Sequence, residues 1–155
     1  MHVRLAAALV LAVAAGCTIK NATPAKPAGK VEIVPAAAAG DVAGLVQSEL
    51  GRAQHDGKQL LVYVGATWCE PCRRFHQAAA GGSLNASLPT LRLLEFDADR
   101  DSERLATAGY FSQYIPLFAL PKADGHASGK QIEGSVKGDG AVTQIVPRLL
   151  TLIGP

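Results

Sequence analysis

The sequence predicts an α/β fold in which a central mixed β-sheet is flanked by helices. Short apolar runs typical of buried strands alternate with longer segments in which apolar residues recur at helical spacing. The 155 residues suit one small domain with additional segments. Apolar residues make up 48% of the chain but aromatic residues only 5%, so the core must consist mainly of aliphatic side chains.

The charge of the chain excludes one class of partner. The formal net charge is +2, and lysine and arginine do not gather in any one stretch. A nucleic-acid-binding domain needs a clustered basic surface. We therefore expect no nucleic-acid partner.

The N-terminal residues indicate an export signal. Residues 5–15 are apolar throughout, and eleven residues are too few to span a bilayer. The run ends in Ala14-Ala15-Gly16-Cys17, which is similar to a bacterial lipobox, although Ala14 stands where leucine is usual. We predict a lipoprotein signal peptide over 1–16. Cleavage as an ordinary secretory signal, leaving a soluble periplasmic protein, is the alternative.

The odd number of cysteines supports a lipid anchor. The chain has three cysteines, of which Cys69 and Cys72 form a natural pair. Cys17 is the odd one, and lipidation explains a single thiol at an exported N-terminus. Thr18 rather than aspartate follows it, which favours the outer over the inner membrane. We expect a protein anchored by lipid on the periplasmic side of a bacterial membrane.

A tether and the first elements of the domain follow. Residues 17–30 are rich in proline, alanine and lysine without periodicity, which predicts a flexible linker. The domain spans 31–155. It begins with an edge strand over 31–34 and a helix capped by Asp41. The next strand, over 59–64, is apolar on both faces, as a buried central strand should be.

The segment after this strand carries the chemistry. It reads Trp68-Cys69-Glu70-Pro71-Cys72 and continues into a segment of helical character. The start of a helix carries partial positive charge and free N–H groups, which stabilise a thiolate and make the first cysteine nucleophilic. The second cysteine lies one turn further on, within reach of a disulfide. Pro71 suits the first turn, where its missing N–H costs nothing.

The remaining elements alternate. We predict a helix over 72–80, strands over 90–96, 117–120 and 131–136, a helix over 101–108, and a last helix capped by Asp139. Pro147 falls inside the last helix and should kink or split it. Asp97-Ala98-Asp99 indicates helix capping rather than a metal site, because no further ligand pattern surrounds it.

The Trp-Cys-x-Pro-Cys motif after an apolar strand resembles the active site of the thioredoxin superfamily. In thioredoxins an Ile-Pro bond is cis and lies beside the two cysteines, and Ile115-Pro116 matches it. The order of elements, including the final hairpin, is also similar. The layout resembles the C-terminal periplasmic domain of the transmembrane thiol:disulfide interchange reductase. The Cys-Glu-Pro-Cys motif resembles that of cytochrome-maturation thioredoxins of the ResA and TlpA type.

The resemblance implies a thioredoxin fold and thiol:disulfide oxidoreductase activity without cofactor or metal. Cys69 would attack a substrate disulfide, and Cys72 would resolve the mixed disulfide. Trp68 would shield the pair, and the backbone of Ile115 and Pro116 would bind an extended substrate segment. We favour a monomeric reductase over an oxidase, acting on protein thiols and disulfides and recharged by a membrane redox partner.

Two positions depart from the family pattern. Thioredoxins usually carry a buried aspartate six residues before the first cysteine, as a proton acceptor for the resolving thiol, and here Tyr63 occupies that position. Glu70, between the cysteines, could relay protons instead. Its charge should also raise the pKa values of the thiols, against the helix dipole. Leu117 follows the proline where many relatives have threonine.

Two other functions stay open at this point. Cys69, Cys72 and His76 lie at i, i+3 and i+7 of one helix and could form an envelope copper-binding module. The chain could also be a structural lipoprotein whose Cys69–Cys72 disulfide is only stabilising. A bond that closes so short a loop restricts the unfolded chain little, which argues against this second alternative.

Overall fold

The computed structural model describes residues 29–154. The predicted signal peptide, Cys17 and most of the predicted linker lie outside these residues, so lipid anchoring and the domain boundaries stay predictions. None of the helices within 29–154 is long and apolar enough to cross a membrane.

Five strands form one mixed sheet in the order β1-β3-β2-β4-β5. The first three strands of that order run parallel, β4 runs antiparallel to β2, and β5 antiparallel to β4. The strands are β1 (Glu32–Pro35), β2 (Gln59–Gly65), β3 (Leu91–Asp97), β4 (Leu117–Pro121) and β5 (Ala127–Glu133). The predicted central strand is therefore β2, paired on both sides.

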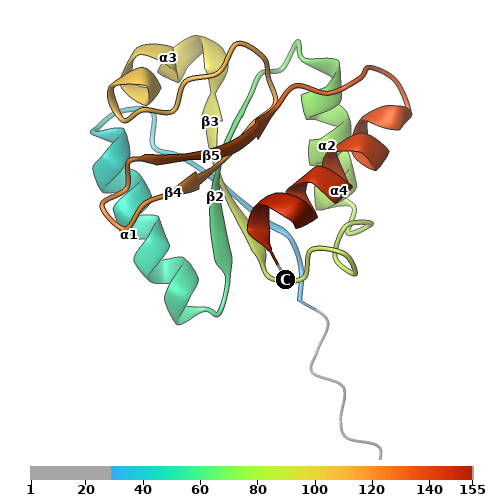
Figure 1. Ribbon diagram of the computed structural model, residues 1–155, viewed down its shortest axis with the longest axis horizontal. Coiled ribbons are helices and arrows are strands. Elements are labelled where there is room, and N and C mark those ends of the chain that lie inside the picture. The colour runs from blue at the N-terminus through green and yellow to red at the C-terminus, as the bar shows by residue number, and fades with distance from the viewer. Residues whose placement is uncertain (1–28, 155) are drawn as a thin grey trace, which may run out of the picture.

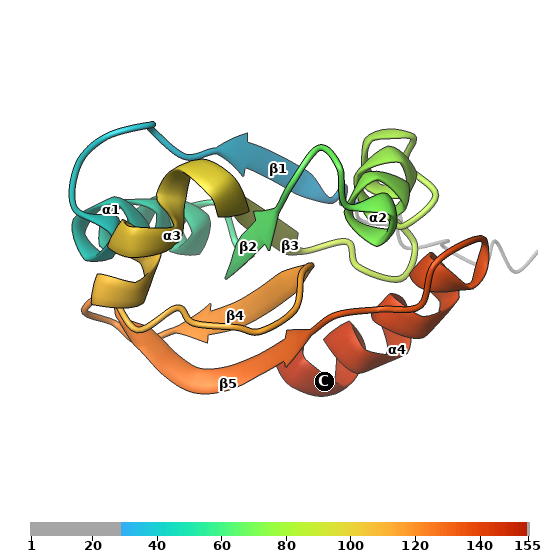
Figure 2. The same cartoon turned by 90° about the horizontal axis from the view of Figure 1, so that it is seen from above.

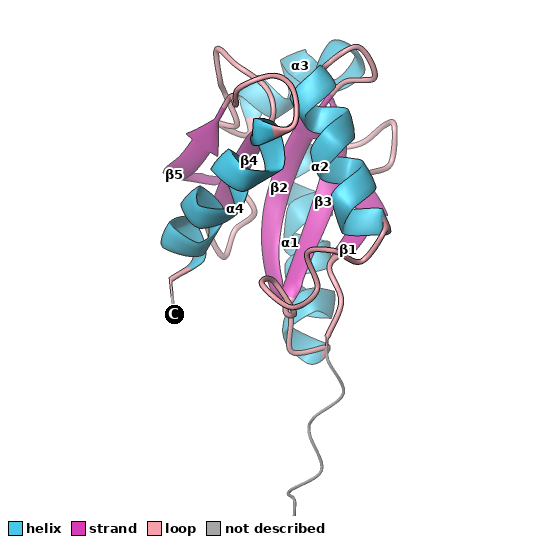
Figure 3. Cartoon of the chain, turned by 90° about the vertical axis from the view of Figure 1, so that its right-hand side faces the viewer, coloured by secondary structure: helices cyan, strands magenta, loops and turns pink. Residues whose placement is uncertain are grey.

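Helices cover both faces of the sheet. Helices α1 (Val42–His55) and α3 (Ala98–Thr107) lie on one face, and α2 (Glu70–Ala80) and α4 (Gly140–Ile153) on the other (Figures 1 and 2). Viewed from the side, β2 and β3 run between α1 and the α2–α4 layer (Figure 3). This arrangement confirms the predicted fold class, a mixed sheet flanked by helices.

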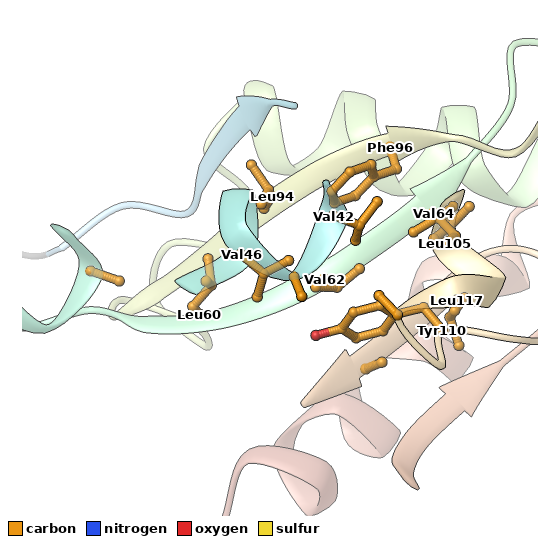
Figure 4. Close-up of a cluster of buried hydrophobic side chains, with 14 residues drawn as sticks. Val42, Val46, Leu60, Val62, Val64, Leu94, Phe96, Leu105, Tyr110 and Leu117 are labelled. Atoms are coloured by element: carbon orange, nitrogen blue, oxygen red, sulfur yellow. The ribbon is translucent and has the colours of Figure 1, made fainter. Parts of the chain in front are cut away.

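The core has one layer on each face of the sheet, and β2 contributes to both. Leu60, Val62 and Val64 point into the layer beneath α1 and α3 (Figure 4). Leu61 and Tyr63 point into the layer beneath α2 and α4. Alternate side chains of a strand face opposite sides, so a strand covered by helices on both sides must be apolar throughout.

Two elements have boundaries that differ from the predicted ones by three or more residues. Helix α3 begins at Ala98, three residues before the predicted start, because the Asp97 carboxylate accepts the backbone N–H groups of Asp99 and Arg100 and caps it. Strand β5 begins at Ala127 and ends at Glu133, rather than spanning 131–136. It ends there because Gly134 adopts a positive φ of 63°, which turns the chain out of the sheet.

Helix α4 continues through Pro147 to Ile153, so the predicted split does not occur. Proline removes one helical hydrogen bond. Ile145 and Leu149, on either side of it, are completely buried against the sheet, and this packing holds the helix together. Asp139 stands at the N-cap as predicted, but its side chain makes no capping hydrogen bond.

Candidate active site

The two cysteines lie where β2 passes into α2. Cys69 is the N-cap of the helix, and its Sγ accepts the backbone N–H of Cys72 at 3.3 Å. The two form a disulfide, with 5.3 Å between their Cα atoms. Pro71 lies in the first turn, as predicted. The helix N–H that bonds to Sγ in this state is available to stabilise a Cys69 thiolate after reduction.

The second predicted motif lies beside the first. The Ile115–Pro116 peptide bond is cis, and Ile115 packs against a small buried cluster of Ala66, Cys69 and Cys72. The two segments are more than forty residues apart in the chain. The tertiary structure therefore brings together the cysteine pair and the backbone that we expect to receive a substrate segment.

Trp68 lies on the surface next to the pair. Its side chain is exposed, and its indole Nε1–H donates to the Asp99 carboxylate at 2.8 Å. Asp99 belongs to the first turn of α3, so the indole is held toward that helix. Shielding of the disulfide by Trp68 stays a prediction.

The Glu70 carboxylate is held by α2 and by the loop before α4. It accepts from Arg74 Nε at 3.1 Å and from the backbone N–H of Gly138 at 3.2 Å. Arg74 also binds Asp139 at 2.7 Å. The hydrogen bond from Arg74 is the main reason that the pKa of Glu70 is lowered. Glu70 is thus an ionised group that joins two elements, and its predicted role as a proton relay stays untested.

Tyr63 occupies the buried position at which thioredoxins usually carry aspartate. Its ring stacks on Phe118 and contacts Phe75, and its hydroxyl donates to the backbone carbonyl of Cys72 at 3.4 Å. Burial, together with the charge of Glu95, raises the pKa of Tyr63 well above its usual value. The phenol therefore stays protonated at neutral pH and cannot accept a proton from a thiol.

A cleft of about 460 Å³ opens between α2, the carboxyl ends of β2 and β3, and the start of α3. We call it the Cys72 cleft, because Cys72 lines it and Cys69 does not. Its lining also includes Tyr63, His76 and Glu95. Sequence analysis named His76 as a candidate metal ligand and did not select Glu95, although a glutamate that follows Leu91 and Leu93 on the same face of a strand was a usable signal.

The copper-binding alternative receives no support from the arrangement of side chains. Across residues 29–154, the structure shows no group of three or more histidine, cysteine, aspartate or glutamate side chains that could hold a metal ion. His76 Nε2 instead lies 3.6 Å from Glu95 Oε2.

Several solved structures are similar to this chain. A poplar thioredoxin h is 21% identical, with a TM-score of 0.45, over 79% of this chain and 97% of its own. The thioredoxin of Trichomonas vaginalis is 18% identical, with a TM-score of 0.47, over 80% of this chain and 97% of its own. Thioredoxin f from spinach chloroplast is 16% identical, with a TM-score of 0.47, over 82% of this chain and 96% of its own. No curated protein matches the chain.

Family membership rests on a sequence match together with the fold. The model of the family described as thioredoxin-like matches residues 45–123, just over half of the chain. The matched segment contains both cysteines and the Ile115–Pro116 bond. A redox-active cysteine pair on this fold supports thiol:disulfide oxidoreductase chemistry in general. The chain therefore belongs to the thioredoxin-like family.

Proposed function

We propose that this protein is a reductase of protein disulfides in the bacterial cell envelope. The observation that carries the proposal is the position of the Cys69–Cys72 disulfide. Cys69 Sγ caps α2, and Ile115 packs beside the pair on a cis Ile-Pro bond. This arrangement supplies a nucleophilic thiol, a resolving thiol and an adjacent backbone for a substrate.

The reaction needs two exchange steps. In the reduced protein the Cys69 thiolate attacks a substrate disulfide, so a Cys69–substrate bond forms and one substrate sulfur leaves as a thiolate. Cys72 then loses its proton and attacks Cys69. The Cys69–Cys72 bond forms, the second substrate sulfur leaves, and the protein has given two electrons to the substrate.

The charges around the pair favour reduction of substrates over oxidation. A strongly oxidising pair has a reduced form that is greatly stabilised. Here the helix N-terminus stabilises a Cys69 thiolate, but the ionised Glu70 between the cysteines repels it. Because strong stabilisation of the reduced form is what makes a pair oxidising, this repulsion favours a reductase over an oxidant.

The location rests on the sequence of residues 1–17. We infer an exported lipoprotein with lipid on Cys17, recharged by a membrane protein that supplies electrons. An intact-mass spectrum of protein extracted from membranes tests the anchor. The expected result is a mature chain that starts at Cys17 and carries added acyl mass. A spectrum without added acyl mass would reject the lipid anchor but leave the redox proposal intact.

The reduction potential of the pair tests the activity. We would equilibrate protein lacking the signal peptide with dithiothreitol or glutathione buffers and measure the oxidised fraction. A potential near that of thioredoxin, about −270 mV, is expected for a reductase. A value near about −120 mV would identify an oxidant instead. Absence of a reversible two-electron couple would reject the oxidoreductase proposal.

A further inference from the structure

Resolution of the mixed disulfide requires a proton acceptor for Cys72. Only a thiolate attacks a disulfide efficiently, and burial in apolar surroundings raises the pKa of a thiol. Cys72 is only 2% exposed, although it lines the cleft beside α2. The neighbouring phenol of Tyr63 stays protonated at neutral pH. Glu70 is bound to Arg74 and Gly138 and does not line the cleft, so we look for the acceptor among the groups that do.

Glu95 is a carboxylate that follows two apolar side chains on one face of β3. Leu91 and Leu93 point from β3 into the core layer beneath α2, and Glu95 follows on the same face. It pairs in register with Tyr63 on β2, at the end of the sheet where α2 begins (Figure 3). Packing does not explain a glutamate here, because a half-buried carboxylate is costly without a partner.

His76 is the partner of Glu95. It lies four residues after Cys72 and therefore on the same side of α2. Its Nε2 atom is 3.6 Å from Glu95 Oε2, which is too long for a hydrogen bond and leaves both groups able to bond water. The Cys72 cleft, with a volume of about 460 Å³, has room for such water, because one water molecule needs a cavity of only on the order of 15 Å³.

The other charged groups of the Cys72 cleft have different roles. Asp97 caps α3 through two backbone N–H groups. Arg100 binds Asp101 through two hydrogen bonds. Arg73 contributes a positive charge but cannot accept a proton. Within the described residues, His76 and Glu95 are the titratable pair in the cleft whose side chains face each other and make no other ion pair or side-chain hydrogen bond.

We propose that His76, supported by Glu95, accepts the proton of the Cys72 thiol through water in the Cys72 cleft. The inference rests on the proposed function. The imidazole takes the proton, and the carboxylate stabilises the imidazolium that forms. The Cys72 thiolate attacks Cys69, the Cys69–Cys72 bond forms, and the substrate sulfur leaves as a thiolate that takes a proton from solvent. When a partner reduces the pair, the imidazolium returns its proton to Cys72.

Stopped-flow reaction with 5,5′-dithiobis(2-nitrobenzoate) separates the two steps. The reduced protein releases one coloured thiolate when Cys69 forms the mixed disulfide and a second when Cys72 resolves it. Cys72→Ser permits only the first release and identifies it. We expect His76→Gln to slow the second release at pH 7 by about a hundredfold, the low end of general-base effects. The first release should keep its rate.

The pH profile distinguishes proton transfer from an indirect effect on the fold. In the wild type, the second release should slow as the pH falls, because a protonated imidazole cannot accept the proton, and His76→Gln should abolish this pH dependence. Glu95→Gln should slow the second release less than His76→Gln does, because the imidazole remains and only the charge that stabilises its protonated form is lost. His126→Gln is the matched control, since His126 lies a comparable 3.5 Å from Asp124, outside the cleft lining. It should behave as the wild type.

Each outcome decides between the two proposals. If the wild type gives two releases and both variants match its rates and pH profile, the proton-accepting role is wrong and the reductase proposal stands. If the variants slow both releases equally, His76 and Glu95 shape the site as a whole, and the role is again wrong. If the wild type gives no second release although Cys72 is reduced, the reductase proposal itself fails.

Discussion

The hydroxyl of Tyr63 donates to the backbone carbonyl of Cys72 at 3.4 Å, directly beneath the first turn of α2. Gly65 lies beside this contact, and a Cβ atom there would come within 2.8 Å of the hydroxyl. The resolving cysteine is thus supported from below by a neutral phenol, and the carboxylate that pairs in register with Tyr63, that of Glu95, stands on the neighbouring strand.

Replacing Tyr63 should distinguish its packing from its hydrogen bond. Tyr63→Phe keeps the contacts with Phe75 and Phe118 and should lower the free energy of unfolding by no more than about 1 kcal/mol. Tyr63→Asp places a carboxylate in a site that is 1% exposed and should cost about 3 kcal/mol or more. Urea unfolding at pH 7 measures both. Equal losses in the two variants would contradict this view of the site.

The two cysteines should be distinguishable by single substitutions. Cys69→Ser should abolish reduction of insulin disulfides, because the thiol at the helix N-terminus is lost. Cys72→Ser should accumulate mixed disulfides with substrate, because nothing resolves them. Turnover assays and non-reducing gels check the two outcomes. Continued turnover by the Cys69→Ser protein would show that the catalytic assignment is wrong.

The fluorescence of the single tryptophan should report the redox state. Trp68 precedes Cys69, and the chain has no other tryptophan. A disulfide quenches a nearby indole, so reduction with dithiothreitol should raise the emission. Cys72→Ser cannot form the bond and should show no change. Equal emission from the oxidised and reduced wild type would place the indole beyond quenching range.

The stability of the fold in acid should depend on Asp101. Its side chain is fully buried and accepts hydrogen bonds from Arg100, Arg104 and the backbone N–H of Asp97. Burial alone would raise the pKa of Asp101, but these donors outweigh burial and lower it. A lowered pKa in the folded state stabilises the protein above the unfolded pKa, near 3.8, and the stabilisation is lost as the pH falls through the folded value.

Asp101→Asn should therefore reduce the free energy of unfolding by about 2 kcal/mol at pH 7, with a smaller difference from the wild type as the pH falls below about 4. Urea unfolding over a pH series measures this. Glu103→Gln, an exposed substitution on the same helix, is the control and should change little at any pH. A difference that stays constant down to pH 2 would show that the Asp101 charge is not responsible.

The parts of the site that sequence analysis predicted depend on local spacing. Cys69, Pro71 and Cys72 lie within one helical turn after an apolar strand, so their arrangement follows from the strand-to-helix pattern alone. The start of α3 was predicted three residues late, because the Asp97-Ala98-Asp99 pattern indicated capping but did not show which of the two carboxylates would be the cap. Pro147 suggested a kinked or split helix, and the helix is not split, because composition does not show how strongly the neighbours of Pro147 are buried.

The parts that sequence analysis missed depend on contacts between elements. Arg92 binds three carboxylates: Glu32 on β1, Glu49 on α1 and Asp56 at the end of α1. No periodicity in the sequence indicates that network. His76 and Glu95 are nineteen residues apart, on a helix and on the strand beneath it. Their distance depends on how α2 lies over β3.

By itself, the sequence determined the order of the elements, the apolar central strand and the cysteine pair at a helix start, because each depends on residues close together in the chain. The tertiary structure decided which groups surround Cys72. Phe75 and Ala79 pack into the same core layer as Leu91 and Leu93, and this packing sets the position of α2 on the sheet. That position brings the imidazole of His76 to the carboxylate of Glu95, and it depends on side chains from several elements fitting together at once.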